Sequence, residues 1–133
     1  MQNSVDMSPS AEDYLEMVYS LYLRNGTIRM TDIASELGVS KPSVNRAIKT
    51  LKGQGLVQQE LYGEINLTEK GIRLAKNVLH RHKLIKHFLV DILGVSSEVA
   101  DKEACHMEHY MSQDTINKFE DFINKYDGQK KTD

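Results

Sequence analysis

Three residues in the second half of the chain have the side chains and the spacing needed to bind a metal ion together. Cys105, Glu108 and His109 stand at positions i, i+3 and i+4 of a segment with helical periodicity. On a helix, this spacing places a thiol, a carboxylate and an imidazole on one face within a turn. These are ligand types for divalent transition metals. The motif predicts a metal site that excludes His106, which projects about 100° away from Cys105.

One histidine and two carboxylates elsewhere are candidates for the same site. His82 falls in the apolar stripe of a long predicted helix, where its ring nitrogens need partners. Asp13 and Glu16 stand at i and i+3 near the start of the first predicted helix. Ordinary structural explanations remain open for both features. A core histidine can bond to a nearby backbone or side-chain group, and the helix dipole favours acidic residues in a first turn.

A polar and basic surface is predicted in the middle of the chain, on a helix that Ser40 caps. Pro42 is tolerated in the first turn of this helix, and an apolar stripe from Val44 to Leu51 is predicted to be buried. The outer face of this helix carries hydrogen-bond donors and cations and has no acidic residue. We predict that Ser43, Asn45 and Arg46 face base edges, and that Lys41, Lys49 and Lys52 contact phosphates. An ordinary solvated face is the alternative.

The elements before and after this helix complete a recognisable pattern. The first helix spans residues 11–24, with Ser8 or Ser10 as its N-cap, and Asn25-Gly26 ends it. A second, short helix follows Thr31 and ends at Gly38, so the link of residues 38–40 predicts a helix-turn-helix. Two short extended segments, 56–60 and 64–67, flank Tyr62-Gly63 and predict a hairpin wing.

The second half of the chain is predicted to be entirely helical. Thr68 caps a long helix to about Leu93, which Gly94 ends, and Ser96 or Ser97 begins a helix that carries residues 103–111. A last helix spans about residues 113–126. The prediction is therefore a mainly α fold with a winged helix-turn-helix domain (1–67), a helical domain (68–126) and a polar tail (127–133).

Composition and charge narrow the class of protein. A chain of 133 residues with 40% hydrophobic and 27% charged residues fits a small globular protein and excludes a large multidomain enzyme. It has no apolar run long enough to cross a bilayer and no signal-peptide pattern, so we expect a cytoplasmic protein without a membrane partner. Residues 24–86 carry twelve Lys/Arg against five Asp/Glu between acidic flanks. Such a basic segment favours a polyanionic partner.

Together these segments resemble the metal-dependent repressors of the diphtheria toxin repressor family, in the two-domain form of the manganese transport regulators. The resemblance covers about residues 8–126. It rests on the helix-turn-helix and wing and on three motifs, Ser10-Ala-Glu-Asp-Tyr-Leu-Glu16, Arg81-His82-Lys83-Leu84 and Glu103-Ala-Cys-His-Met-Glu-His-Tyr-Met-Ser112. It implies a DNA-binding winged helix, a dimerisation domain from about Thr68 and a divalent-metal site between them.

The resemblance also implies which residues bind metal and which metals they suit. It places the family's ligands at Asp13, Glu16, His82, Cys105, Glu108 and His109. The manganese-responsive branch typically has glutamate in place of Cys105 but matches Asp13 and Glu16. The iron-responsive branch usually has the cysteine but typically has methionine in place of Asp13. The set is a hybrid, so we expect Mn²⁺ or Fe²⁺ as cofactor, with Co²⁺ or Zn²⁺ able to bind in vitro.

An ancillary metal site of the iron-responsive branch has different residues here. It uses the position of His82 together with a glutamate where this chain has Lys86 and a histidine where it has Asp101. An ammonium group cannot act as a ligand, so we expect no second site of that type. The alternative is that Lys86 takes the place of the cation by pairing with a carboxylate.

The expected function is that of a divalent-metal-dependent transcriptional repressor of metal homeostasis genes, and not of an enzyme. Its expected partners are palindromic operator DNA and a second copy of the chain. The acidic ligands would repel one another when ionised, and a bound cation would neutralise that repulsion. Because the cation would tie the two domains together, it would also set the distance between the two recognition helices of a dimer. Two other functions stay open: a winged-helix regulator that senses a small organic ligand, and a small metallohydrolase with an open coordination position.

Overall fold

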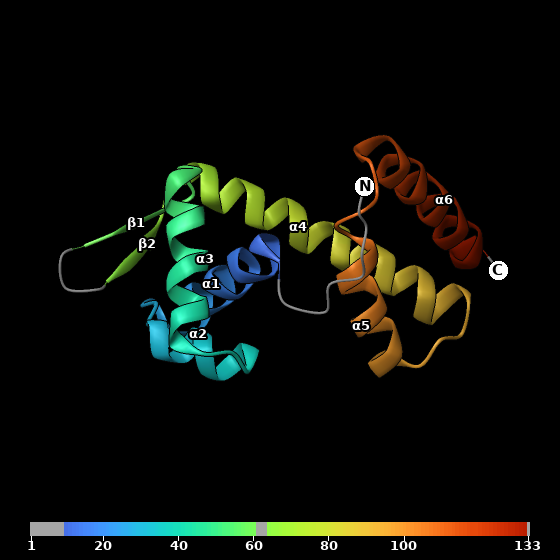
Figure 1. Ribbon diagram of the computed structural model, residues 1–133. Coiled ribbons are helices and arrows are strands. Elements are labelled where there is room, and N and C mark those ends of the chain that lie inside the picture. Colours follow the sequence, from blue (N-terminus) through green and yellow to red (C-terminus); the bar gives the residue numbers. More distant parts are fainter. Residues whose placement is uncertain (1–9, 61–63, 133) are drawn as a thin grey trace. The chain divides into compact units, whose positions relative to one another are not determined.

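The fold is mainly helical and divides into two compact units, as a computed structural model that describes residues 10–60 and 64–132 shows (Figure 1). The side chains of residues 130–132 are not described. The units separate between Lys76 and Asn77, within a helix. The elements are α1 (Ala11–Asn25), α2 (Met30–Leu37), α3 (Lys41–Gly53), β1 (Val57–Gln59), β2 (Ile65–Leu67), α4 (Glu69–His87), the π-helical segment η1 (Phe88–Ile92), α5 (Ser97–Met107) and α6 (Gln113–Thr132).

Helix α1 begins with a reciprocal capping box. The backbone N–H of Asp13 donates to Oγ of Ser10 at 3.1 Å, and the N–H of Ser10 donates to Oδ2 of Asp13 at 2.8 Å. The predicted Ser10 cap is confirmed, whereas Ser8 lies outside the described residues. Gly26 ends the helix in the left-handed conformation, with φ of 74°, as the Asn25-Gly26 pair predicts.

Helices α2 and α3 form the predicted helix-turn-helix. The start of α2 differs from the prediction, because the N–H groups of Asp32 and Ile33 both bond to the carbonyl of Arg29, which puts Thr31 inside the first turn. Ser40 caps α3 by accepting from the N–H of Ser43 at 3.2 Å, as predicted. The apolar stripe of α3 is buried through Val44, Ile48 and Leu51, with Ala47 half-buried.

The predicted wing is present as an antiparallel pair of strands. Gln58 pairs with Asn66 at the centre, flanked by the pairs Val57–Leu67 and Gln59–Ile65. Val57 and Ile65 are buried, so the inward positions of both strands join the core of the first unit. The turn at Tyr62-Gly63 lies outside the described residues.

The junction between wing and α4 is unusually tight. The hydroxyl of Thr68 donates to the carbonyl oxygen of Gly55 at 2.7 Å and accepts from the N–H of Gly71 at 3.0 Å, so Thr68 caps α4 as predicted. A Cβ atom on Gly71 would lie 2.1 Å from the carbonyl oxygen of Leu56. The first turn of α4 therefore contacts the backbone just before β1 so closely that only glycine fits.

The long helix changes type before Gly94, which the sequence did not predict. After His87 the backbone widens into η1, where the N–H of Leu93 bonds to the carbonyl of Phe88, five residues back. Five residues are too few for apolar periodicity to separate this wider turn from an α-helix.

The second unit has its own core, in which η1, α5 and α6 pack on the end of α4. The core residues are Ile85, Leu89, Ala100, Ala104 and Ile116. Helix α5 begins after its predicted cap, Ser96, but it ends at Met107 rather than Met111. Helix α6 continues to Thr132, beyond the predicted end at Tyr126. Asp127 lies within it and contacts His87 across the unit at 3.2 Å, so the polar composition of this stretch did not make it a tail.

In the part of the chain that the structure describes, no helix combines the length and the apolar character that crossing a bilayer requires. The predicted functional boundary at residues 67/68 precedes α4, whereas the compact units divide within α4. The assignment of functions to residues 1–67 and 68–126 stays a prediction.

Candidate metal centre and nucleic-acid interface

The second unit brings His82 of α4 against Glu108, which follows the last turn of α5. Nδ1 of His82 lies 2.9 Å from Oε1 of Glu108, and the Glu108 side chain is fully buried. The other carboxylate oxygen, Oε2, is also buried and has no hydrogen-bond partner among the described residues. A buried carboxylate oxygen without a partner is costly, which makes this position suited to a cation.

Cys105 and His109 complete this cluster. The Cys105 side chain is half-buried, and its proximity to His82 contributes to the raised pKa of that ring. Nε2 of His109 lies 3.9 Å from Oε2 of Glu108, the oxygen without a hydrogen bond. Although α5 ends before Glu108, the backbone of Glu108 keeps right-handed helical angles (φ −60°, ψ −28°), so the predicted i, i+3, i+4 arrangement survives the helix end. The four candidates of the second unit thus lie together.

Electrostatics favour a proton on His82 when no metal is present. Hydrogen bonds to Cys105 and then to Glu108 and Asp101 raise the pKa of His82 to about 11, against the opposing effect of burial. The ring is therefore an imidazolium whose two N–H groups donate to acidic partners. The cluster offers a thiol, a buried carboxylate and two imidazoles, and this set of donors fits a divalent transition metal once His82 has lost its proton.

Sequence reasoning missed the role of Asp101 as a partner of His82. Oδ1 of Asp101 lies 2.8 Å from Nε2 of His82 and 3.4 Å from Nζ of Lys86. The hydrogen bond from His82 holds the pKa of Asp101 below its usual value. A signal was present, since Asp101 stands four residues before Cys105, and Lys86 stands four residues after His82. Lys86 thus pairs with a carboxylate, which is the contact that the alternative reading of Lys86 requires.

The two remaining metal candidates, Asp13 and Glu16, lie in the first unit on α1. Both side chains are half-buried and stand one turn apart. Asp13 takes part in the capping box through Oδ2, so the structural explanation of a first-turn carboxylate holds for this residue. Capping does not remove the carboxylate's charge, so this role and that of a metal ligand are compatible.

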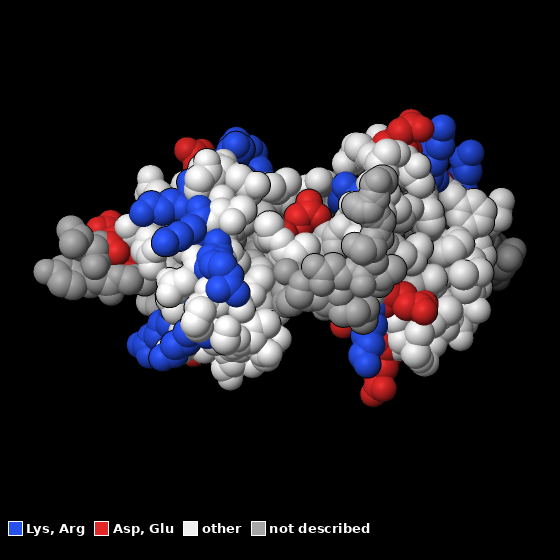
Figure 2. All heavy atoms as spheres, in the orientation of Figure 1, with Lys and Arg blue, Asp and Glu red and all other residues white. Residues whose placement is uncertain are grey.

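The predicted nucleic-acid face lies on α3. Lys41, Asn45, Arg46 and Lys49 are exposed there, and Ser43 is half-buried. Figure 2 shows Lys and Arg side chains gathered over the region where α3 lies in Figure 1. The Ser43 hydroxyl lies 2.9 Å from that of Ser40 and accepts a hydrogen bond from Nη2 of Arg46 at 3.2 Å. This chain of bonds restrains the Arg46 guanidinium on the exposed face.

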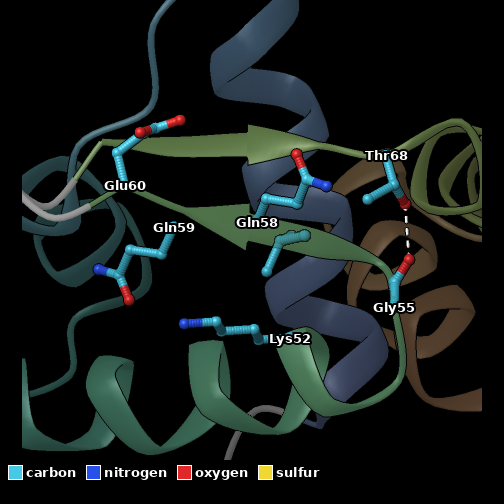
Figure 3. A pocket seen from close by; sticks show the side chains of 7 residues that line it. Lys52, Gly55, Gln58, Gln59, Glu60 and Thr68 are labelled. Carbon is cyan, nitrogen blue, oxygen red and sulfur yellow. Dashed lines mark hydrogen bonds between the residues drawn. The ribbon is translucent and has the colours of Figure 1, made fainter.

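Lys52 lies in the last turn of α3, next to the wing. It lines a hollow between the end of α3 and the wing, and its side chain extends along the helix toward Gln59 (Figure 3). Gln58 and Glu60 line the same hollow. The sequence did not single out these wing residues, although Gln58 occupies the solvent-facing position of its strand. Lys52 is thus placed beside the wing.

Two protein-family models match the chain, one for each part. Residues 6–65 match the model of the iron dependent repressor, N-terminal DNA binding domain. Residues 68–131 match the model of the iron dependent repressor, metal binding and dimerisation domain.

Several curated relatives match most of the chain. An HTH-type transcriptional regulator of Methanocaldococcus jannaschii is 41% identical over 122 residues, which is 90% of this chain and 97% of that protein. The transcriptional regulator MntR of Salmonella typhimurium is 36% identical over 115 residues, 86% of this chain and 73% of its own. The HTH-type transcriptional regulator MntR of Bacillus subtilis is 33% identical over 120 residues, covering 90% and 84%.

Solved structures share the fold. The manganese regulator SloR matches 89% of this chain with a TM-score of 0.81 and 33% identity. The metal-dependent transcriptional regulator MtsR also matches 89%, with a TM-score of 0.82 and 30% identity. In both comparisons the match covers 55% of the other chain, so this chain spans little more than half the length of these two proteins.

Proposed function

Because this chain belongs to the iron-dependent (diphtheria toxin) repressor family of metal-dependent, DNA-binding transcriptional regulators, we propose that it represses metal homeostasis genes in response to Mn²⁺ or Fe²⁺. Members of this family are transcriptional regulators and not enzymes. The two matched domains imply DNA and a second copy of the chain as partners. A regulator of this kind acts where the chromosome is, so a cytoplasmic location is part of the proposal.

The observation that carries the proposal is the buried Glu108 carboxylate, with one oxygen on His82 and the other without a hydrogen bond. It lies in the part of the chain that matches the metal-binding domain. A bound divalent cation would give the unbonded oxygen of Glu108 a positively charged partner and would take over the charge that the proton on His82 provides without metal. The proposed ligands are Asp13, Glu16, His82, Cys105, Glu108 and His109.

The proposed ligands come from both functional domains, which we assign as residues 1–67 for DNA binding and 68–126 for metal binding and dimerisation. Residues 127–132, predicted as a polar tail, continue α6. Asp13 and Glu16 belong to the same compact unit as α3. Restraining them relative to the dimerisation domain would set the spacing of the two α3 helices in a two-fold dimer, as half-sites one helical turn apart require. DNA binding would tighten metal binding in return.

On the DNA, we propose that α3 enters the major groove of a palindromic operator. Arg46, restrained by Ser43, and Asn45 present hydrogen-bond donors suited to base edges. The exposed ammonium groups of Lys41 and Lys49 suit phosphates, and Lys52 beside the wing suits a phosphate farther along the strand. Ser43 has a hydroxyl already bonded to Ser40 and Arg46, so its proposed role at a base edge includes positioning Arg46.

The identity of the metal follows from the ligand types and from the relatives. Relatives named as manganese regulators and a model named for iron-dependent repressors both match this chain. Carboxylates and imidazoles suit Mn²⁺ and Fe²⁺, whereas the Cys105 thiol favours softer ions. ScaR, another similar protein, has been solved with bound Cd²⁺ and with bound Zn²⁺. We propose Mn²⁺ or Fe²⁺ as the activating ion, with Co²⁺ and Zn²⁺ able to occupy the site in vitro.

The two other functions considered from the sequence have less support. The match to regulators rather than enzymes speaks against a metallohydrolase. A sensor of a small organic ligand would leave the match of residues 68–131 to a metal-binding domain unexplained.

The deciding experiment is DNA binding by purified metal-free protein titrated in parallel with Mn²⁺, Fe²⁺ (anaerobically), Co²⁺ and Zn²⁺. Palindromic DNA selected from a random pool serves as the target, and a shuffled duplex serves as the control. We expect retention of the palindrome only with metal and its loss when a chelator is added. Equal binding with and without metal would contradict the proposed function.

A further inference from the structure

His82 is held from two opposite sides by carboxylates that have different surroundings. On its Nδ1 side lies Glu108, which is fully buried and belongs to the candidate metal cluster. On its Nε2 side lies Asp101, which is 55% exposed and also pairs with Lys86. The ring therefore lies between the candidate metal centre and a partly exposed ion pair.

An imidazole can bind a metal through one nitrogen only if the other carries the remaining hydrogen. A carboxylate that accepts this N–H selects the tautomer, fixes the ring orientation and makes the metal-binding nitrogen more basic. In this structure the carboxylate on Nε2 already pairs with an ammonium group, which favours its ionised, accepting form.

We propose, on the basis of the metal-dependent function proposed above, that Asp101 is a positioning residue that accepts Nε2–H of His82, so that Nδ1 is the atom presented to the metal. Asp101 acts through His82 and is not itself a ligand. Lys86 supports this role because its ammonium group pairs with the same carboxylate oxygen, Oδ1, and so favours the ionised form of Asp101.

A consequence for metal stoichiometry follows from this geometry. Nε2 of His82 is hydrogen-bonded to Asp101, and Asp101 is paired with Lys86. The Nε2 side of the ring is therefore occupied by one hydrogen bond and one ion pair. His82 therefore serves metal on its Glu108 side alone.

The test is NMR of the histidine side chains in ¹⁵N-labelled protein, with Zn²⁺ as a diamagnetic probe. Long-range ¹H–¹⁵N spectra distinguish a protonated nitrogen from a metal-bound one. For His82 we expect Nδ1 bound to zinc and Nε2 protonated. Zinc on Nε2 would overturn the inference while leaving a metal-dependent regulator intact. If zinc leaves both nitrogens of His82 unchanged, the inference and the assignment of His82 as a ligand both fail.

Variants separate positioning from general stability. Asp101→Ala should weaken zinc binding by about 10- to 100-fold, the usual effect of removing a carboxylate behind a metal-binding histidine. Asp101→Asn keeps an acceptor without the charge, so it should retain the Nδ1-bound tautomer and lose less affinity. Asp91→Ala is the matched control, because Asp91 forms the same kind of pair with His87 in the same unit.

The control should lose stability without losing zinc affinity. Equal zinc affinities in wild type, Asp101→Ala and Asp91→Ala, measured by competition with a chelating dye, would reduce Asp101 to a structural residue and overturn the inference. Thermal unfolding of all three proteins without metal gives the stability change for comparison.

Discussion

Nδ1 of His82 lies 2.9 Å from Oε1 of Glu108, so a hydrogen bond joins a histidine in the second half of α4 to a carboxylate after the end of α5. The two residues are 26 positions apart in the sequence. Their hydrogen bond satisfies Oε1 but leaves Oε2 of Glu108 buried without one among the described residues. In the metal-free protein, the proton on His82 thus provides part of the positive charge that a bound cation would provide.

Metal binding should therefore release a proton from His82. Its pKa of about 11, raised by Cys105, Glu108 and Asp101, means that the ring is protonated at neutral pH, whereas a ligand histidine must be neutral. Calorimetric titration in buffers of different ionisation enthalpy counts the protons. We expect about one more proton released per metal by wild type than by His82→Gln. Equal release would contradict proton displacement from this ring.

The same protonation should make the metal-free protein lose stability in alkali. A raised pKa contributes stability that is fully present below the unfolded value of 6.5 and is lost as pH rises through about 11. The difference in unfolding free energy between wild type and His82→Gln should thus shrink from pH 7 to pH 11 in the presence of chelator. Urea unfolding at several pH values measures it, and a constant difference would be inconsistent with the raised pKa.

Glu108→Gln and His109→Ala should each abolish metal-stimulated DNA binding while leaving a folded dimer. Glutamine preserves the volume and one hydrogen-bonding oxygen at the buried position but removes the charge that attracts a cation. Operator binding and metal titration measure the loss, and sedimentation checks the dimer. His106→Ala, at an exposed histidine in the last turn of α5, is the control that should behave as wild type. A normal metal response in both site variants would remove these residues from the site.

Cys105→Glu should raise the response to Mn²⁺ relative to Fe²⁺ and Co²⁺. A thiolate favours softer ions, whereas a carboxylate gives the oxygen-and-imidazole ligand set that Mn²⁺ prefers. DNA binding at increasing concentrations of each metal gives the order of response in wild type and variant. An unchanged order would indicate that the half-buried Cys105 serves only packing.

Arg46→Ala should weaken binding to the operator more than to unrelated DNA, because a guanidinium restrained by Ser43 is suited to reading a base. The cost should be about 1–3 kcal/mol. Lys49→Ala should weaken all sequences alike and lower the slope of log affinity against log salt by about one phosphate contact. Affinities measured at several salt concentrations test both. Unchanged values in both variants would exclude this face of α3 from the interface.

Gly71→Ala should destabilise the first unit by about 1–3 kcal/mol, the usual cost of overpacking, or more. The added Cβ would lie 2.1 Å from the backbone oxygen of Leu56, which cannot move aside as a side chain could. Gly53→Ala is the control, because a Cβ there meets nothing within 4 Å. Chemical denaturation of both variants decides the point, and equal stabilities would show that the α4 contact relaxes without cost.

Local signals made most of the secondary structure predictable. Caps such as Ser10, Ser40 and Ser96 bond to backbone three residues ahead, and Gly26 ends its helix within one residue, so both act over distances that the sequence displays directly. The predictions failed where no such signal exists. The change to π-helical hydrogen bonding in η1 and the extension of α6 past Tyr126 depend on packing against residues elsewhere in the unit.

The sequence by itself determined the kinds of ligand available, because the i, i+3, i+4 spacing of Cys105, Glu108 and His109 fixes a shared face on any helix. Only the tertiary structure decided which nitrogen of His82 meets Glu108 and which meets Asp101. The reason is that the packing of α5 against the end of α4 determines these contacts. No local rule specifies an imidazole's orientation between residues 19 and 26 positions away.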